Sequence, residues 1–369
     1  MLQHNTQPTP CAADVFRVGR RRSLNPPPCW GRVQTNVNKQ YIEKPVFSAI
    51  IQTFKDNAPQ PQQLVTRLRA VPLPKEIIVN DDSQGARRDI WVPLLDGANE
   101  FYISSPNLHE VRAYNRLAQF ARGEYLVFVQ GDCCLPAKPF WMTDATRIFK
   151  ALPQLAMLSA RVGFNDILDW TMDKYFRNNR TWGASPYLPL DHVLHAPPSN
   201  TTTAKEGPLP FMFAPGVDNG PLLYRRDALL RVGGFDESYS CAAGHLSGHY
   251  DFEVSLRFWT KGYQVGVFYG FATNSAGRDA KPRKTMSTPA KKNERHKNEV
   301  WNGKRIARLW AAHNATIASR LEASKLQHLV ALPPEQREAT RLEHEKRIGK
   351  LSKLGCYAGI VKRKTPLPS

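Results

Sequence analysis

The fold of this chain is decided by the run Glu124-Tyr125-Leu126-Val127-Phe128-Val129-Gln130. Its five central residues are all aromatic or aliphatic, and Gly131 ends the run. A short continuous run of such residues predicts a strand that is buried on both faces of a sheet. A strand of this kind needs helices on both sides, so the predicted class of fold is α/β.

Helix and strand patterns alternate on both sides of this run. Residues 109–122 have apolar residues at helical spacing, and Gly123 ends that helix. Further strands are predicted over 47–54, 76–80, 100–104, 155–162, 219–224 and 264–269, and further helices over 62–69, 140–152, 226–232 and 250–261. The alternation predicts a mostly parallel, Rossmann-like sheet flanked by helices, and such sheets bind ligands at the carboxyl ends of their strands.

The net charge of +19 lies at the two ends of the chain. Residues 1–45 carry seven basic and two acidic residues, and residues 276–369 carry 22 basic and eight acidic ones, so the middle is neutral. We therefore predict a basic, disordered tail over 1–44, an α/β domain over 45–275 and a basic linker with a helical extension over 276–369. The basic ends could contact an anionic partner, whereas the neutral middle disfavours nucleic-acid binding as the main function.

The helical extension has a predicted packing face. Helices are predicted over 299–332 and 334–354, and Ile306, Trp310, Ile317 and Leu321 recur at helical spacing in the first of them. Residues 164–215 follow neither a helix nor a strand pattern, and we expect them to fold over a site and to choose the acceptor.

The sequence also limits the location and the cofactors. No run approaches the roughly 18 apolar residues of a membrane span, and there is no clear signal peptide. The prediction is a protein without an integral membrane segment, and a cytoplasmic or organellar location is favoured over a luminal one. The six cysteines include no Cys-x-x-Cys pair, so a structural zinc site is not predicted.

Polar residues follow the predicted strands at the edge where a ligand is expected. Asp132 could ligate Mg²⁺ or Mn²⁺, which prefer oxygen ligands. Asp81 and Asp82 could accept hydrogen bonds from a nucleotide base or ribose, and Arg112 could reach a base or a phosphate. Each has a simpler interpretation: the aspartates as a turn or a helix cap, Asp132 as a loop carboxylate and Arg112 as a surface charge.

Taken in order, these segments resemble the family 2 glycosyltransferases, which have the GT-A fold. The resemblance covers about residues 46–270, and Val232-Gly233-Gly234-Phe235-Asp236-Glu237 is its most specific segment. The other matching segments are Thr53 at the end of the opening strand, Val79-Asn80-Asp81-Asp82-Ser83, Arg112 with Asn115, Ala121-Arg122-Gly123-Glu124-Tyr125, Gln130-Gly131-Asp132 at the Asp-x-Asp metal motif, and Tyr250-Asp251-Phe252-Glu253 followed by Lys261-Gly262-Tyr263.

The resemblance implies an inverting transfer of a sugar from a nucleotide diphosphate sugar to a hydroxyl group of a glycan, lipid or protein acceptor. It implies that Asp132 binds Mn²⁺ or Mg²⁺ and that Asp251 is the general base. The implied donor-binding residues are Thr53, Asp81, Asp82, Arg112, Asn115 and Gln130. The residues implied to line the acceptor side are Gly220, Gly233 and Gly234.

Two departures from the family pattern keep an alternative open. Gln130 stands where the metal motif has its first Asp, and Tyr250 stands where a Glu usually precedes the base. Asp251 itself could instead be a helix N-cap. The alternative is a catalytically degenerate binding or structural protein that keeps the GT-A fold and contacts an anionic partner through its basic ends.

Overall fold

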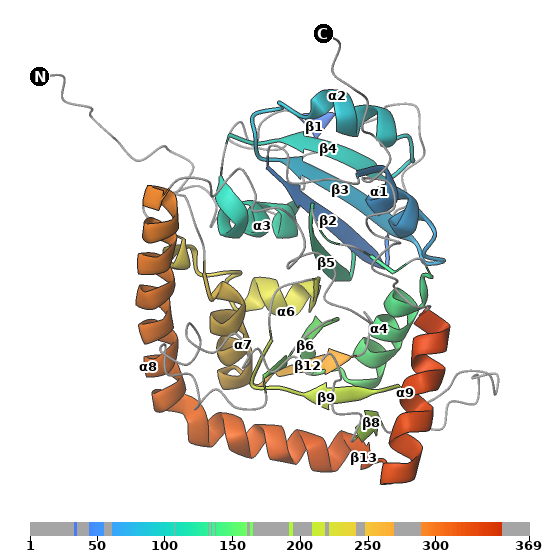
Figure 1. Ribbon diagram of the computed structural model, residues 1–369, viewed down its shortest axis with the longest axis vertical. Coiled ribbons are helices and arrows are strands. Elements are labelled where there is room, and N and C mark those ends of the chain that lie inside the picture. Colours follow the sequence, from blue (N-terminus) through green and yellow to red (C-terminus); the bar gives the residue numbers. More distant parts are fainter. Residues whose placement is uncertain are drawn as a thin grey trace, which may run out of the picture.

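The computed structural model describes residues 33–34, 44–54, 61–106, 108–131, 133, 135–136, 138–160, 163–164, 192–194, 209–217, 221–240, 248–268 and 289–348. Within these residues, one nine-stranded sheet has the order β1-β4-β3-β2-β5-β11-β6-β12-β9 (Figure 1). Its strands are β1 (Val33–Gln34), β2 (Phe47–Thr53), β3 (Lys75–Asp81), β4 (Glu100–Ser104), β5 (Tyr125–Gln130), β6 (Leu155–Ser159), β9 (Phe211–Phe213), β11 (Leu222–Arg225) and β12 (Gln264–Phe268).

Helices cover both faces of the sheet. One side carries α1 (Pro61–Arg69) and α4 (Phe140–Ala151), and the other carries α3 (His109–Phe120), α6 (Arg226–Arg231) and α7 (Tyr250–Thr260) (Figure 1). Strand β5 shows the two faces directly, because the Phe128 ring lies 4.4 Å from Tyr114 of α3 while the Tyr125 ring stacks at 4.7 Å on Phe149 of α4. The shorter elements are α2 (Arg88–Trp91), η3 (Val92–Leu94), η4 (Glu237–Tyr239), β7 (Gly163–Phe164), β8 (His192–Leu194) and β10 (Gly216–Val217).

The sheet is mostly parallel, as the sequence predicts. Strands β4, β3, β2 and β5 pair in parallel, and so do β6 and β12. Strand β11 lies between β5 and β6 and runs antiparallel to both. Its residues Leu222, Leu223 and Tyr224 are all buried. A continuous apolar run shows that a strand is covered on both faces, but it does not show the direction in which the strand runs.

The segment before β5 is fixed by a buried carboxylate. Glu76 of β3 accepts hydrogen bonds from Ser48 Oγ (2.6 Å) and from Arg122 N–H (2.5 Å), and its other oxygen pairs with Arg122 Nε (2.8 Å). A Cβ atom on Gly123 would lie 2.5 Å from the Ser48 backbone nitrogen. The chain entering β5 therefore needs a glycine at 123, because β2 passes too close for a side chain.

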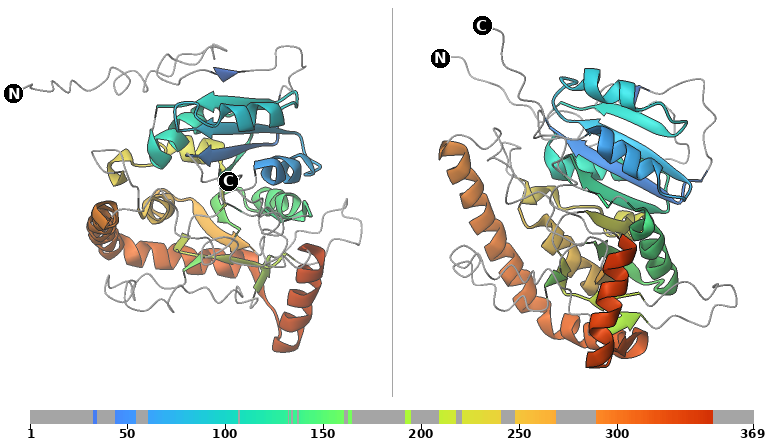
Figure 2. Two further views of the ribbon diagram at one scale, coloured as in Figure 1. Left: turned by 45° about the horizontal axis from the view of Figure 1, so that its top comes forward. Right: turned by 45° about the vertical axis from the view of Figure 1, so that its right-hand side comes forward.

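The C-terminal extension packs against the domain. Helix α8 (Pro289–His328) starts earlier and ends earlier than the predicted helix over 299–332, and proline at its first position suits a helix start. Strand β13 (Leu329–Ala331) then pairs antiparallel with β8, and α9 (Pro334–Ile348) follows. Helix α8 runs along α7, changes direction below the sheet and leads to α9, which lies beside α4 (Figures 1 and 2).

The predicted packing face of α8 is confirmed. Ile306 and Ile317 are fully buried, Leu321 is 8% exposed, and all three belong to the main hydrophobic core, against which Trp310 also packs. At the other end, β1 falls within the predicted tail over 1–44 and pairs with β4, while the rest of residues 1–43 lies outside the described part. None of the described helices combines the length and apolarity needed to cross a bilayer.

The anchoring of α8 can be tested by truncating one buried side chain. Ile317→Ala should lower the free energy of unfolding by about 2–5 kcal/mol, because it leaves a cavity in the core. Leu326→Ala is the matched control, since Leu326 is 87% exposed and its loss should change stability by less than about 0.5 kcal/mol. Urea unfolding followed by tryptophan fluorescence measures both, and equal effects would contradict the packing of α8.

Candidate functional site

Three parallel strands end side by side at the carboxyl edge of the sheet. Thr53 at the end of β2 pairs in register with Asp81 at the end of β3, and Gln52 pairs with Gln130 at the end of β5. Thr53 also accepts a hydrogen bond at its backbone oxygen from Asp82 N–H (2.9 Å). The structure therefore brings the predicted donor-side residues of these strands together at one edge.

The two aspartates at the end of β3, Asp81 and Asp82, are buried and hydrogen-bonded within the chain. Asp81 accepts from Arg87 N–H (2.9 Å) and Tyr102 Oη (2.7 Å), and also from the hydroxyl and N–H of Ser83. These bonds hold the turn after β3, as expected for an aspartate at a strand end.

Asp82 holds the start of α3. It is 1% exposed and accepts from Ser105 Oγ (2.5 Å), Leu108 N–H (2.6 Å) and His109 N–H (2.7 Å). Burial outweighs these bonds and raises the pKa of the Asp82 carboxyl above its usual value. Asp82 therefore fixes where α3 begins, and α3 carries Arg112 and Asn115.

A glutamate that the sequence analysis did not select lies against Gln130. Glu110, in the first turn of α3, accepts from Gln130 Nε2 (2.7 Å) and from Tyr114 Oη (3.1 Å) through the same oxygen, Oε1. A carboxylate from α3 thus lies at the end of β5, where the metal motif has an Asp in the resembling family. No sequence motif marks Glu110, because its approach to Gln130 depends on how α3 packs.

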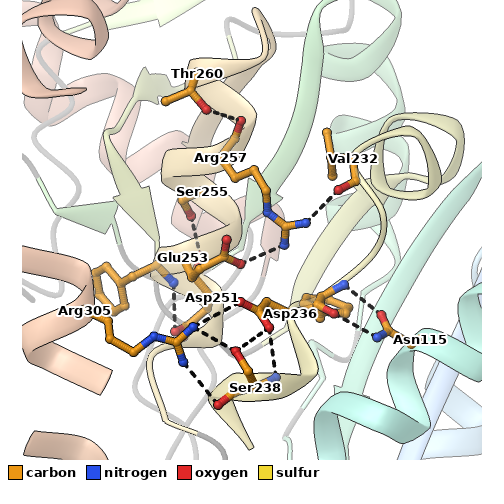
Figure 3. A network of polar contacts seen from close by, with 12 residues as sticks. Asn115, Val232, Asp236, Ser238, Asp251, Glu253, Ser255, Arg257, Thr260 and Arg305 are labelled. Carbon is orange, nitrogen blue, oxygen red and sulfur yellow. Dashed lines mark hydrogen bonds and ion pairs between the residues drawn. The ribbon is translucent and has the colours of Figure 1, made fainter. Parts of the chain in front are cut away.

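Arg112 and Asn115 of α3 both contact the Gly-Gly-Phe-Asp-Glu turn, and Figure 3 shows the contacts of Asn115. Asn115 Nδ2 donates to the Phe235 carbonyl oxygen (2.9 Å), and Phe235 N–H donates to Asn115 Oδ1 (2.7 Å). Asn115 also donates to Glu237, with which Arg112 forms an ion pair at 3.6 Å. Two motifs that are 120 residues apart in the sequence are therefore one structural unit.

The two glycines of this turn have different environments. Both have a positive φ angle, +90° at Gly233 and +77° at Gly234. A Cβ atom on Gly234 would lie 2.5 Å from Asn115 Oδ1, whereas a Cβ atom on Gly233 would have no described atom within 4 Å. Gly234 is required by the close approach of Asn115, and Gly233 by its backbone conformation.

Asp251 lies in the first turn of α7 and is 5% exposed. Its Oδ1 accepts from Phe252 N–H (3.0 Å), and its backbone oxygen accepts from Ser255 Oγ (2.6 Å). The N-cap of α7 is His249, so the alternative interpretation of Asp251 as the N-cap is wrong.

Tyr250 belongs to an aromatic core, which accounts for a tyrosine at the position where the resembling family has a Glu. Its ring lies 5.5 Å from Phe235 and 6.3 Å from Tyr114. Burial raises the pKa of the phenols of Tyr250 and Tyr224, and the charges of Glu110 and Asp251 raise both further. The geometric link between the end of β5 and the start of α7 is Tyr114, which bonds to Glu110 and packs against Tyr250.

A second set of contacts joins α7 to the turn from its other side. Buried Glu253 pairs with Arg257 at 2.7 Å, and Arg257 Nη1 donates to the Val232 carbonyl oxygen (2.7 Å). From α8, Arg305 reaches Asp236 and Ser238 (Figure 3). Asn302, also on α8, reaches Tyr239 and Gly248. Glu253 and Arg257 fall in a segment that the sequence singles out by resemblance, but no role could be predicted for them, and neither Asn302 nor Arg305 could be selected at all. Charged and amide side chains are common on helix surfaces, so only tertiary packing shows which of them make such contacts.

Two predicted site residues cannot be placed. Asp132 and Gly220 lie outside the described residues, as does most of the segment 164–215. Within the described residues, no group of three or more His, Cys, Asp and Glu side chains could hold a metal ion. The side chains with oxygen atoms at the end of β5 are the carboxylate of Glu110 and the amide of Gln130. Asp132 follows Gln130 by two residues in the sequence. Oxygen ligands of this kind fit Mg²⁺ or Mn²⁺ better than a soft metal.

Several solved structures of glycosyltransferases are similar to this chain. A mannosyltransferase from Pyrobaculum calidifontis, in complex with GDP-Man and Mn²⁺, is 17% identical, with a TM-score of 0.40 over 84% of this chain and 87% of its own. S. aureus TarS residues 1–349, in complex with UDP, is 16% identical with a TM-score of 0.40. GalNAc-T7, in complex with UDP, GalNAc and Mn²⁺, is 12% identical with a TM-score of 0.41.

The chain spans only part of two of these proteins, 57% of the TarS fragment and 47% of GalNAc-T7. No family model and no curated protein matches the sequence. At these identities and TM-scores the function of the chain does not follow from the likeness. The α/β class, with its mostly parallel sheet between helices, follows from the strand order described above.

The contact between Asn115 and the turn gives a matched test. Gly233→Ala should lower the free energy of unfolding by about 1–2 kcal/mol, because the left-handed backbone strains an alanine. Gly234→Ala should cost clearly more, because its Cβ also meets Asn115 Oδ1.

The excess cost should disappear when Asn115 is shortened. In an Asn115→Ala background, Gly234→Ala should cost no more than Gly233→Ala, a coupling of about 0.5–3 kcal/mol in a double-mutant cycle by urea unfolding. Additive costs of Asn115→Ala and Gly234→Ala would show that the two residues do not share this contact.

Proposed function

We propose that this chain is an inverting glycosyltransferase that transfers a sugar from a nucleotide diphosphate sugar to a hydroxyl acceptor. The observation that carries the proposal is the pairing of Asn115 with Phe235, because it joins the helix on the donor side to the turn beside Asp251. The motifs that resemble the family 2 glycosyltransferases are thus in contact, as a two-substrate site requires.

The donor side consists of Thr53, Asp81, Asp82, Arg112, Asn115 and Gln130. Arg112 is partly exposed, and its guanidinium can reach a diphosphate or a base. Asp81, Asp82 and Asn115 are engaged by the protein itself, so their contribution is to shape the end of β3 and to hold α3 in place. Thr53 and Gln130 belong to the same side, at the neighbouring ends of β2 and β5.

Asp251 is the general base of the proposed reaction. Its carboxylate takes the proton of the acceptor hydroxyl while the hydroxyl oxygen forms a bond to the anomeric carbon of the donor sugar. The bond from that carbon to the diphosphate oxygen breaks with its electron pair, so a nucleoside diphosphate leaves. Because the two oxygens lie on opposite sides of the carbon, the configuration inverts. Burial of Asp251 limits its contact with bulk water.

A divalent ion, Mn²⁺ or Mg²⁺, when bound by Asp132 with Glu110 or Gln130, would neutralise charge on the leaving diphosphate. Glu110 is the proposed source of the carboxylate that the motif lacks at 130, since its Oε1 lies 2.7 Å from Gln130 Nε2. The identity of the sugar, of the nucleotide and of the glycan, lipid or protein acceptor is part of what the experiment below determines.

The acceptor side is assigned to Gly220, Gly233 and Gly234. A Cβ atom on Gly233 would meet no described atom, so this glycine leaves room beside the turn, whereas Gly234 accommodates Asn115. The basic ends are proposed to contact an anionic surface, where Lys and Arg would act through their charge.

A second candidate function is a degenerate binding or structural protein with the same fold. Two observations favour it: the Gln130 amide donates to Glu110, and Tyr250 is buried in the aromatic core where a second carboxylate would stand. Such a protein would bind a nucleotide sugar without consuming it, so binding and turnover must be measured separately.

The deciding measurement is nucleoside diphosphate release from a panel of nucleotide sugars, with and without Mn²⁺, in the presence of hydroxyl acceptors. The wild type should release diphosphate from one donor in a metal-dependent way, and Asp251→Asn should be slower by about 10²- to 10⁴-fold, because the base is lost. Asp227→Asn is the control, since Asp227 is an exposed residue of α6.

Each result has a distinct meaning. Wild-type activity that Asp251→Asn leaves unchanged would contradict the assignment of the base. Donor binding by calorimetry without turnover would favour the degenerate protein, and no binding to any donor would contradict the proposed function itself.

A further inference from the structure

Helix α8 contacts both sides of the chain segment that precedes Asp251. Asn302 is 3% exposed, and its Nδ2 donates to the Tyr239 carbonyl oxygen (2.9 Å) and to the Gly248 carbonyl oxygen (3.0 Å). Tyr239 ends the turn η4, and Gly248 lies three residues before Asp251. One buried amide group therefore fixes the distance between the turn and the start of α7.

The next contact on the same face of α8 is made by Arg305. Its guanidinium lies 3.8 Å above the Tyr239 ring and donates to Ser238 O (3.1 Å), Ser238 Oγ (2.8 Å) and Asp236 Oδ2 (3.2 Å). The planar guanidinium makes these bonds from two nitrogens while it stacks on the Tyr239 ring, whereas a lysine has a single nitrogen and no planar group to stack. Burial alone would raise the pKa of Asp236, but the bonds from Ser238 and the charge of Arg305 lower it, so the contact is a charged one.

The contacts of Asn302 and Arg305 lie on one side of the start of α7, and further contacts hold its other side. On the far side, Glu253 and Arg257 tie α7 to Val232, and Glu253 N–H donates to the His249 carbonyl oxygen (3.1 Å). Ile306 is fully buried next to Arg305 and anchors α8 in the core. The backbone that carries Asp251 is therefore held by α8 on one side and by the Gly-Gly-Phe-Asp-Glu turn on the other (Figure 3).

We propose that Asn302 and Arg305 are positioning residues for Asp251, and that α8 is consequently part of the catalytic unit. The inference rests on the proposed function, in which Asp251 is the base. A base must lie within hydrogen-bond reach of the acceptor hydroxyl, and a displacement of about 1 Å can cost about 10²-fold in rate. The donor-side residues lie on β2, β3, β5 and α3. In the described part of the chain the bonds of Asn302 and Arg305 go to the turn and to Gly248, so they reach α3 only indirectly, through the turn residues Phe235 and Glu237.

The test separates catalysis from donor binding in the full chain. Asn302→Asp keeps the size of the side chain but replaces the donating NH₂ group with a carboxylate oxygen, which would face the carbonyl oxygens of Tyr239 and Gly248. Arg305→Lys keeps the positive charge but loses the planar guanidinium. Both should lower kcat at least about tenfold, with Arg305→Ala below Arg305→Lys, while KM for the donor stays within about threefold. Lys304→Ala, an exposed neighbour with the same charge, should leave kcat unchanged.

Two further measurements exclude a general loss of structure. Calorimetry should give the wild-type Kd for the nucleoside diphosphate of the active donor, and amide hydrogen exchange should quicken at 249–254 but not in β2 or β3. Unchanged kcat in the Asn302 and Arg305 variants, or a loss of donor binding equal to the loss of kcat, would overturn the inference while the proposed function stands. A wild type that turns over no donor would overturn both.

Discussion

The structure depends on one amide group that pairs with a backbone. Asn115 bonds to the N–H and to the carbonyl oxygen of Phe235, which is how one β-strand residue would bond to another. Because the Asn115 side chain lies so close to the backbone before Phe235, residue 234 must be a glycine. The positive φ angle of Gly234 also favours a glycine. The half of the sheet that ends at Thr53, Asp81 and Gln130 is joined in this way to the part that carries Asp251. This contact adds to the pairing of β5 with β11 and to the packing of Tyr114 against Tyr250, which join the same two parts of the fold.

Much of the fold could be predicted because apolar runs indicate which segments are buried. Strands β2, β3, β5 and β12 and helices α3, α4 and α7 lie within a residue or two of their predicted positions, since apolar runs and helical spacing mark where an element begins and ends. The direction of β11 could not be predicted, because an antiparallel strand covered on both faces has the same composition as a parallel one. The start of α8 at Pro289 was missed because a proline in a basic, polar stretch also fits a linker.

The candidate site could be predicted where the backbone conformation requires one residue type. It could be predicted less well where a side chain from a distant part of the sequence makes the contact. Gly123, Gly233 and Gly234 could be singled out by motif, and the structure supplies their reasons. Glu110, Asn302 and Arg305 could not, because nothing in a helical sequence tells which polar side chain will turn inward. Tyr250 is intermediate: the sequence shows that a carboxylate is absent, but only the packing of Tyr114 and Phe235 shows what replaces it.

The position of α8 also bears on the order in which the chain becomes native during synthesis. The strands that carry Thr53, Asp81 and Gln130 can pair once residue 130 has been made, whereas the carbonyl oxygens of Tyr239 and Gly248 find their partner only when Asn302 has been added. Strand β8 likewise gains β13 only after residue 331. Contacts of such large sequence separation form late, because the intervening chain must first be closed into a loop. A nascent chain would thus complete the strands that end at Thr53, Asp81 and Gln130 well before the segment around Asp251 is fixed. Under the proposed function, such a chain would have its donor-side strands but no positioned base.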